Sequence, residues 1–200
     1  FCSADFCKNA SYRLIDFENV FTPDLFSKWD DLLDELGVVH QMFLYSVSDS
    51  KITIDVKCAF LVELAEPIVE VVKERTYYFA SLEPGSRGTT LNNCLDALII
   101  KYGKEIFNKE LSSSQYNQFL NVLVNSRVNI MHVKRNQRKP ALNGKQSCLY
   151  AQKLSLLYRK ILFELLQIND SLYLEKLKHC VLNLDNWNSI SDDFLSWLSK

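Results

Sequence analysis

The sequence predicts an all-α protein: a bundle of about five to six helices that follows a short irregular N-terminal lead-in. Three observations favour this class. Of 200 residues only 5 are Gly and 4 are Pro, which is few for the turns of a β-sandwich or barrel. Apolar side chains recur at helical spacing over long stretches. Hydrophobic residues make up 48% and charged residues 24% of the chain, as in folded rather than disordered proteins.

The beginning of the chain is its least regular part. Residues 1–20 show weak periodicity, so they are interpreted as a lead-in or the end of a preceding domain, with a strand possible over 12–17. Thr22-Pro23-Asp24 predicts a helix start, since a hydroxyl caps a helix, Pro suits its first position and an acid favours its dipole. We expect Gly37 to end or bend this helix, which continues over 39–47.

Five further helices are expected, separated by polar breaks. The longest apolar-periodic segment contains Pro67, which predicts a kink. Three serines at 112–114 are expected to cap the helix that follows them. The expected helices cover about 52–78, 90–107, 115–132 and 147–168, and a sixth begins after Asn169-Asp170-Ser171.

These elements suggest three units. Residues 1–20 form the lead-in and 21–183 form the helical bundle. The tail, 184–200, is interpreted as a short amphipathic helix that packs back on the body or on a partner. It carries the aromatic residues Trp187, Phe194 and Trp197.

Charge is distributed unevenly, although the formal net charge is only −1. The segment from Leu111 to Phe163 contains no Asp or Glu, but it holds 9 of the basic residues. Such a partition makes one face electropositive. That face is either a site for a polyanion or a surface that docks on the acidic part of the same chain. The basic residues are Arg127, Lys134, Arg135, Arg138, Lys139, Lys145, Lys153, Arg159 and Lys160.

Several functional classes are disfavoured. The 6 Cys are scattered without a CxxC pair, which favours reduced, buried thiols over a zinc site, and we expect no metal and no cofactor. No run of 18 or more apolar residues exists, so we expect no membrane span. No secretory signal is visible, which favours a cytoplasmic protein, and the start at Phe1 suggests a fragment or a processed chain.

A candidate site lies at the end of the expected helix 115–132, before the basic loop. Arg127-Val-Asn-Ile-Met-His132 combines a guanidinium, which binds phosphate, with an imidazole, which titrates near neutral pH. On a helix, five positions advance about 500°, so the two side chains lie about 140° apart. They reach one ligand only if the helix ends or distorts between them, or if a second protomer completes the site. Alternatively, His132 is a capping or surface histidine at a helix C-terminus.

Three stretches of the chain resemble the HEPN superfamily, and most closely the HEPN domain of ApeA-like phage-defence proteins. HEPN domains are helical bundles whose signature is an Arg, four to six residues, and then a His late in the bundle. The similarity covers roughly residues 50–170. In the family a polar residue, often Asn, follows the Arg, whereas here Val128 follows it and Asn129 comes one position later. The matching stretches are Asp55 to Glu70 with Glu74 to Tyr77, Leu91 to Tyr102, and Asn125 to His132 with Leu154 to Leu166.

The resemblance implies a metal-independent endoribonuclease that acts as a homodimer in anti-phage defence by abortive infection. It makes Arg127 and His132 the catalytic residues, with a 2′,3′-cyclic phosphate on the product. Asn129 and Glu70 are auxiliary candidates, because Glu70 aligns with an acidic position of the family. The basic loop is expected to bind the RNA backbone through Lys134, Arg135, Arg138 and Lys139.

Two other functions stay open. Helical bundles of this superfamily also serve as catalytically inactive modules that bind RNA or dock proteins, and Val128 keeps that alternative in place. The start at Phe1 and the aromatic tail are also compatible with a structural subunit of a larger assembly.

Overall fold

Every regular element in the described part of the chain is a helix, which confirms the all-α class. The computed structural model describes residues 13–48, 51–84, 89–132, 139–187 and 189–199. No strand occurs within these ranges. The longer helices are α3 (Pro23–Leu36), α4 (Val38–Val47), α5 (Ile54–Glu63), α6 (Ala65–Lys73), α7 (Leu91–Tyr102), α9 (Tyr116–Met131), α10 (Gly144–Leu165), α11 (Leu174–Asp185) and α12 (Ile190–Leu198). The short elements are α2 (Phe17–Val20), α8 (Asn108–Leu111) and the 3₁₀ turns η1 (Tyr77–Phe79) and η2 (Asp170–Leu172).

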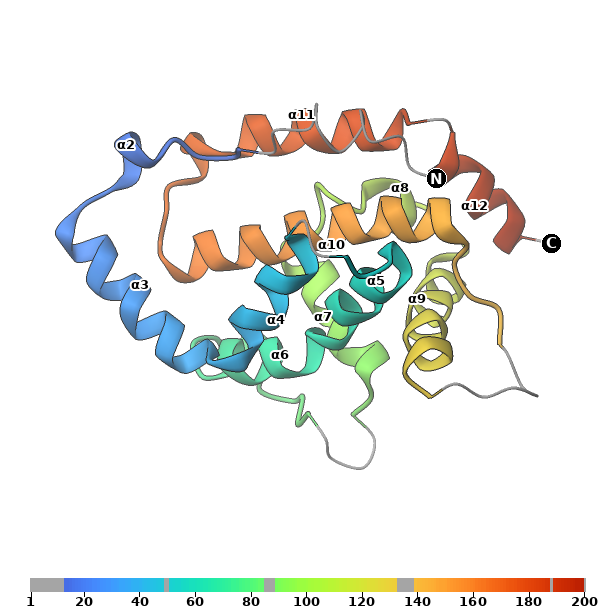
Figure 1. Ribbon diagram of the computed structural model, residues 1–200, viewed down its shortest axis with the longest axis horizontal. Coiled ribbons are helices and arrows are strands. Elements are labelled where there is room, and N and C mark those ends of the chain that lie inside the picture. The colour runs from blue at the N-terminus through green and yellow to red at the C-terminus, as the bar shows by residue number, and fades with distance from the viewer. Residues whose placement is uncertain (1–12, 49–50, 85–88, 133–138, 188, 200) are drawn as a thin grey trace.

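Helix α5 lies at the centre of the bundle. It packs against α9, α10 and α4, while α7 contacts both α6 and α9. Helix α10 is the longest element, with 22 residues, and it lies between α5 on one side and the C-terminal helices α11 and α12 on the other (Figure 1). The candidate site on α9 is therefore carried by a helix that rests directly on the central element.

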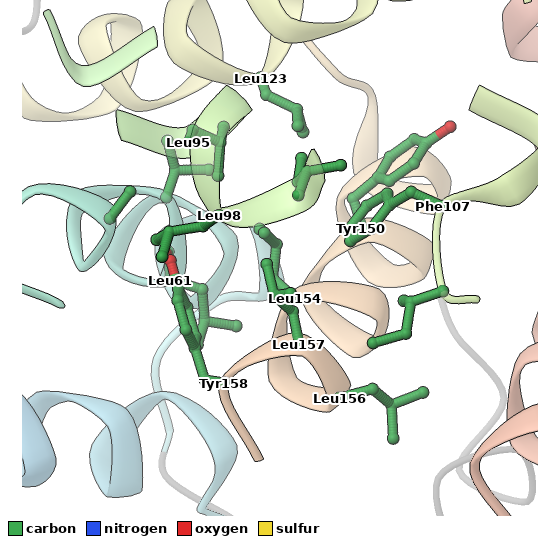
Figure 2. Packing of buried hydrophobic residues seen from close by; sticks show 14 of the residues in the cluster. Leu61, Leu95, Leu98, Phe107, Leu123, Tyr150, Leu154, Leu156, Leu157 and Tyr158 are labelled. Atoms are coloured by element: carbon green, nitrogen blue, oxygen red, sulfur yellow. The ribbon is translucent and has the colours of Figure 1, made fainter. Parts of the chain in front are cut away.

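The core is built from leucines and aromatic rings that several helices contribute. Figure 2 shows the side chains of α10 meeting those of α5, α7 and α9. The Tyr158 hydroxyl of α10 donates a 2.5 Å hydrogen bond to the Leu61 carbonyl oxygen near the end of α5. This bond satisfies a polar group that burial would otherwise make costly. Side chains that are at most 2% exposed here include Leu61, Leu95, Leu98, Leu123, Leu154, Leu157 and Tyr158.

The bundle has more helices than expected because two expected helices are divided. Gly37 ends α3 with φ 49° and ψ −120°, a conformation that residues with a Cβ avoid, and α4 starts at the next residue. Pro67 lacks the N–H that would bond the Glu63 carbonyl, and the segment breaks at Leu64 into α5 and α6. Leu64 keeps helical dihedrals, with φ −64° and ψ −13°, so the division between α5 and α6 corresponds to the expected kink.

Two expected helix boundaries were wrong. The helix predicted over 90–107 ends at Tyr102, and Gly103 is its C-cap. Gly103 packs so closely on the preceding turn that an added Cβ would lie 2.9 Å from the Ile99 carbonyl oxygen. The serines at 112–114 do not cap α9, whose N-cap is Gln115. Instead, the Ser113 hydroxyl accepts a 3.1 Å hydrogen bond from the Gln115 N–H.

Both ends of the described chain join the main core. Leu14 is buried there, and residues 13–16 form no strand before α2 begins. Phe194 of the tail helix α12 is fully buried, with its ring centroid 6.3 Å from that of Phe119 and 5.4 Å from that of Tyr150. Of the two placements expected for the tail, packing on the body is the one observed.

Candidate functional site

Arg127 and His132 meet because helix α9 ends between them. The helix stops at Met131, and His132 is its C-cap, with φ −113° and ψ 11° and its N–H bonded to the Val128 carbonyl oxygen. Arg127 Nη1 lies 3.3 Å from His132 Nε2. The angular conflict of a continuous helix is resolved within one chain.

The contact places a donor-only group against the imidazole. A guanidinium carries only N–H donors, and its Nη1 faces the Nε2 edge of the His132 ring. His132 is exposed to solvent, whereas the Arg127 side chain is only 21% exposed. The pair thus consists of a guanidinium that the protein mostly covers and an imidazole that solvent can reach.

A third residue, Glu63, completes the cluster and was not expected from the sequence. It is the last residue of α5, and its carboxylate accepts two hydrogen bonds from Arg127, one from Nε and one from Nη2 at 2.7 Å. Helices α5 and α9 pack directly on each other, as Figure 1 shows, so Glu63 and Arg127 are neighbours although they stand 64 positions apart in the sequence. Hydrogen bonds from Arg127 to Glu63 raise the pKa of Arg127 above its usual value, which keeps the guanidinium charged.

The acidic candidate Glu70 lies elsewhere. It is exposed on α6, and its charge acts on the Cys94 thiol of α7, whose pKa burial raises to about 11. Glu66 lies between Glu63 and Glu70 in the sequence, and its negative charge also raises the pKa of Arg127. A sequence signal for Glu63 did exist: it stands four residues before Pro67, at the point where a helix must break.

Asn129 contacts the backbone rather than the pair of Arg127 and His132. Its Nδ2 donates a 2.9 Å hydrogen bond to the Lys139 carbonyl oxygen. One turn earlier, buried Ser126 Oγ accepts a 2.8 Å hydrogen bond from the Leu142 N–H. Together they hold the segment that leads into α10, whose first turn is closed by a capping box between Asn143 and Gln146.

The basic segment divides into paired and exposed side chains. Arg127 pairs with Glu63, and Lys160 pairs with Glu105 over 2.7 Å. Of the two interpretations of the basic segment, these two side chains follow the one in which basic residues pair with acidic residues of the same chain. Lys139 and Lys145 are exposed. Of the four residues expected to bind RNA, Lys134, Arg135 and Arg138 lie outside the described residues.

The described ranges contain neither a cluster of metal-binding side chains nor a helix that could span a membrane. No group of three or more His, Cys, Asp or Glu there is arranged to hold a metal ion. Within the same ranges, no helix combines the length and the apolar character that a membrane span requires. Four cysteines lie in the described ranges, where none of them forms a disulfide bond, and Cys58, Cys94 and Cys148 among them are buried.

No family model, curated protein or solved structure matches the chain. The chemistry of the site is therefore inferred from the side chains of Arg127, His132 and Glu63 and from their contacts.

Proposed function

We propose that this chain is a metal-independent endoribonuclease of the HEPN type. The observation that carries the proposal is the contact between Arg127 and His132 at the exposed end of α9. A charged guanidinium binds a phosphodiester, and an adjacent imidazole moves a proton near neutral pH. The all-helical architecture supports the same proposal, which includes a HEPN-like arrangement of the bundle and a role in abortive infection.

The reaction uses a nucleophile that RNA itself supplies. The His132 imidazole, which lies beside Arg127, takes the proton of a ribose 2′-OH through a ring nitrogen that is not protonated. The 2′-oxygen attacks the neighbouring phosphorus, and Arg127 stabilises the charge that grows on the phosphorane oxygens. The bond from phosphorus to the 5′-oxygen then breaks, and that oxygen takes a proton from a general acid. The products are a 2′,3′-cyclic phosphate and a 5′-hydroxyl.

The general acid is the remaining requirement. A site with one imidazole that has accepted the 2′-OH proton needs a second group to protonate the leaving oxygen. A homodimer with α9 of both chains at the two-fold axis supplies a second His132. This homodimer is part of the proposal.

The proposal predicts cleavage of total RNA in the presence of EDTA. Replacing His132 or Arg127 by Ala should each lower the cleavage rate at least about 100-fold, the scale for a general base or a charge-stabilising donor. Both side chains are at least partly exposed, so the variants should fold normally. Cleavage is followed by gel, and cyclic phosphate ends are identified by mass spectrometry.

Three results would contradict the enzyme assignment. They are full activity in either variant, cleavage that EDTA abolishes, and retention of labelled RNA without turnover. The last result would instead identify an inactive RNA-binding module. Val128 is the observation that favours this second candidate, because an apolar side chain stands where the HEPN signature carries a polar one.

A further inference from the structure

We infer that Glu63 is the positioning residue for Arg127, and this inference rests on the proposed ribonuclease function. A guanidinium offers two edges that can each donate a pair of parallel hydrogen bonds, Nε with Nη2 and Nη1 with Nη2. Glu63 takes the first edge with both of its carboxylate oxygens. The second edge includes Nη1, the atom that contacts His132 Nε2.

The ion pair therefore sets the rotation of the guanidinium. An unpaired Arg side chain samples many rotamers, and holding it in one of them costs conformational entropy. With one edge held by Glu63, the other edge faces the imidazole. A phosphate bound to that edge would lie next to the group that removes the 2′-OH proton.

Glu63 is itself held by the core. Its neighbours Leu61, Val62 and Leu64 are at most 1% exposed. The Tyr158 hydroxyl of α10 bonds the Leu61 carbonyl oxygen, which fixes the end of α5 from the opposite side. Helix α5 ends at Glu63, so the Glu63 side chain projects from the last turn of a helix that is packed in the core. A carboxylate on such a support can orient a long, flexible partner.

A rival role for Glu63 makes the opposite prediction. A carboxylate that occupied the phosphate position would inhibit the enzyme, and removing its charge would speed up cleavage. The 30% exposure of the Glu63 side chain makes it accessible enough for that role to be tested.

The test compares Glu63→Gln with Glu66→Gln as a matched control. Both changes remove one negative charge near Arg127, but only Glu63 accepts its hydrogen bonds. We expect Glu63→Gln to lower kcat about 100-fold, as for a misplaced catalytic group, with KM changed less than about threefold. Glu63→Asp should restore part of the rate, because it retains a carboxylate. Glu66→Gln should cleave like the wild type.

A double-mutant cycle with Arg127→Lys decides whether Glu63 acts through Arg127. Lys keeps the charge but has no edge for Glu63 to orient. If Glu63 only positions the guanidinium, the double variant is as slow as Arg127→Lys alone. Multiplying effects, a faster Glu63→Gln enzyme or an unchanged Glu63→Gln enzyme would each overturn the inference. Melting curves identify variants that do not fold, and Glu63→Asp then takes the place of Glu63→Gln in the cycle.

Failure of the proposed function looks different. In that case the wild-type chain cleaves no RNA, whatever residue stands at position 63. Failure of the inference about Glu63 requires an active wild-type enzyme that His132→Ala inactivates.

Discussion

Lys153 is a fully buried cation that connects three helices. Its Nζ lies 2.7 Å from Glu110 Oε1 of α8 and 2.6 Å from Asp185 Oδ1 of α11. Replacing Lys153 by Met leaves two carboxylates without their cation in a dry environment. We expect this change to lower the free energy of unfolding by about 3–5 kcal/mol. Urea unfolding followed by circular dichroism measures the loss.

Lys109 is the matched control for Lys153. It pairs with Asp192 over 2.9 Å, but both side chains are partly exposed, so Lys109→Met should cost at most about 1 kcal/mol. Equal losses in the two variants would mean that burial of the Lys153 pair does not determine its contribution.

At the scale of single residues, the candidate site was predictable where it is local in sequence. Arg127 and His132 stand five positions apart, so their spacing revealed them together. Glu63 was not predicted, because its contact with Arg127 depends on how α5 packs on α9. Its position four residues before Pro67 indicated a helix boundary but not the long-range partner, and Glu70 was the acidic residue predicted instead.

Gly37 illustrates how one residue determines an element. Its backbone, at φ 49° and ψ −120°, lies where residues with a Cβ are strained. Gly37→Ala should therefore destabilise the protein by about 1–3 kcal/mol. Gly144 is the control, since it starts α10 with nothing within 4 Å of an added Cβ. Gly144→Ala should be neutral or should stabilise the protein by up to about 1 kcal/mol.

Thermal melting curves of the two variants test this difference. A Gly37→Ala protein that melts at or above the wild-type temperature would show that the break between α3 and α4 tolerates a side chain. Such a result would also make Gly37 an accidental boundary rather than a required one.

At the scale of elements, one helix start with a local chemical cause was predicted correctly, whereas the expected serine cap of α9 was wrong. Thr22 caps α3 as expected, accepting a 3.1 Å hydrogen bond from the Leu25 N–H. The end of α7 was missed by five residues because it depends on Gly103 fitting against Ile99 and Phe107. A helix cap depends on three or four neighbouring residues. Close packing depends on contacts with residues that the hydrophobic periodicity does not identify.

At the scale of the whole molecule, the sequence predicted the class and not the arrangement. Helical periodicity and the scarcity of Gly and Pro are sufficient for an all-α protein. The position of α5 between α9 and α10 requires knowledge of which apolar faces meet, and many pairings satisfy the same pattern. The charge partition was likewise real, but part of it is used inside the molecule, as Lys153 and Lys160 show.

The structure also changes the reason for expecting a dimer. A second protomer is not needed to bring Arg127 to His132, because one chain does so at the end of α9. What remains is the need for both a base and an acid when each chain contributes one His132. A shared site then requires two intact protomers, whereas an independent site requires one.

Mixing protomers distinguishes these cases. Wild-type chain and the His132→Ala variant are combined in equal amounts, allowed to exchange, and assayed at fixed total protein. If both imidazoles are needed, random pairing leaves about a quarter of the wild-type rate, since only one dimer in four has two intact sites. A control mixture combines wild-type chain with His179→Ala, which lacks an exposed histidine of α11. Its cleavage rate should equal that of the wild type alone. Light scattering should give about twice the chain mass of 23.2 kDa. A fully active monomer, or a mixture that retains half of the wild-type rate, would contradict the shared site.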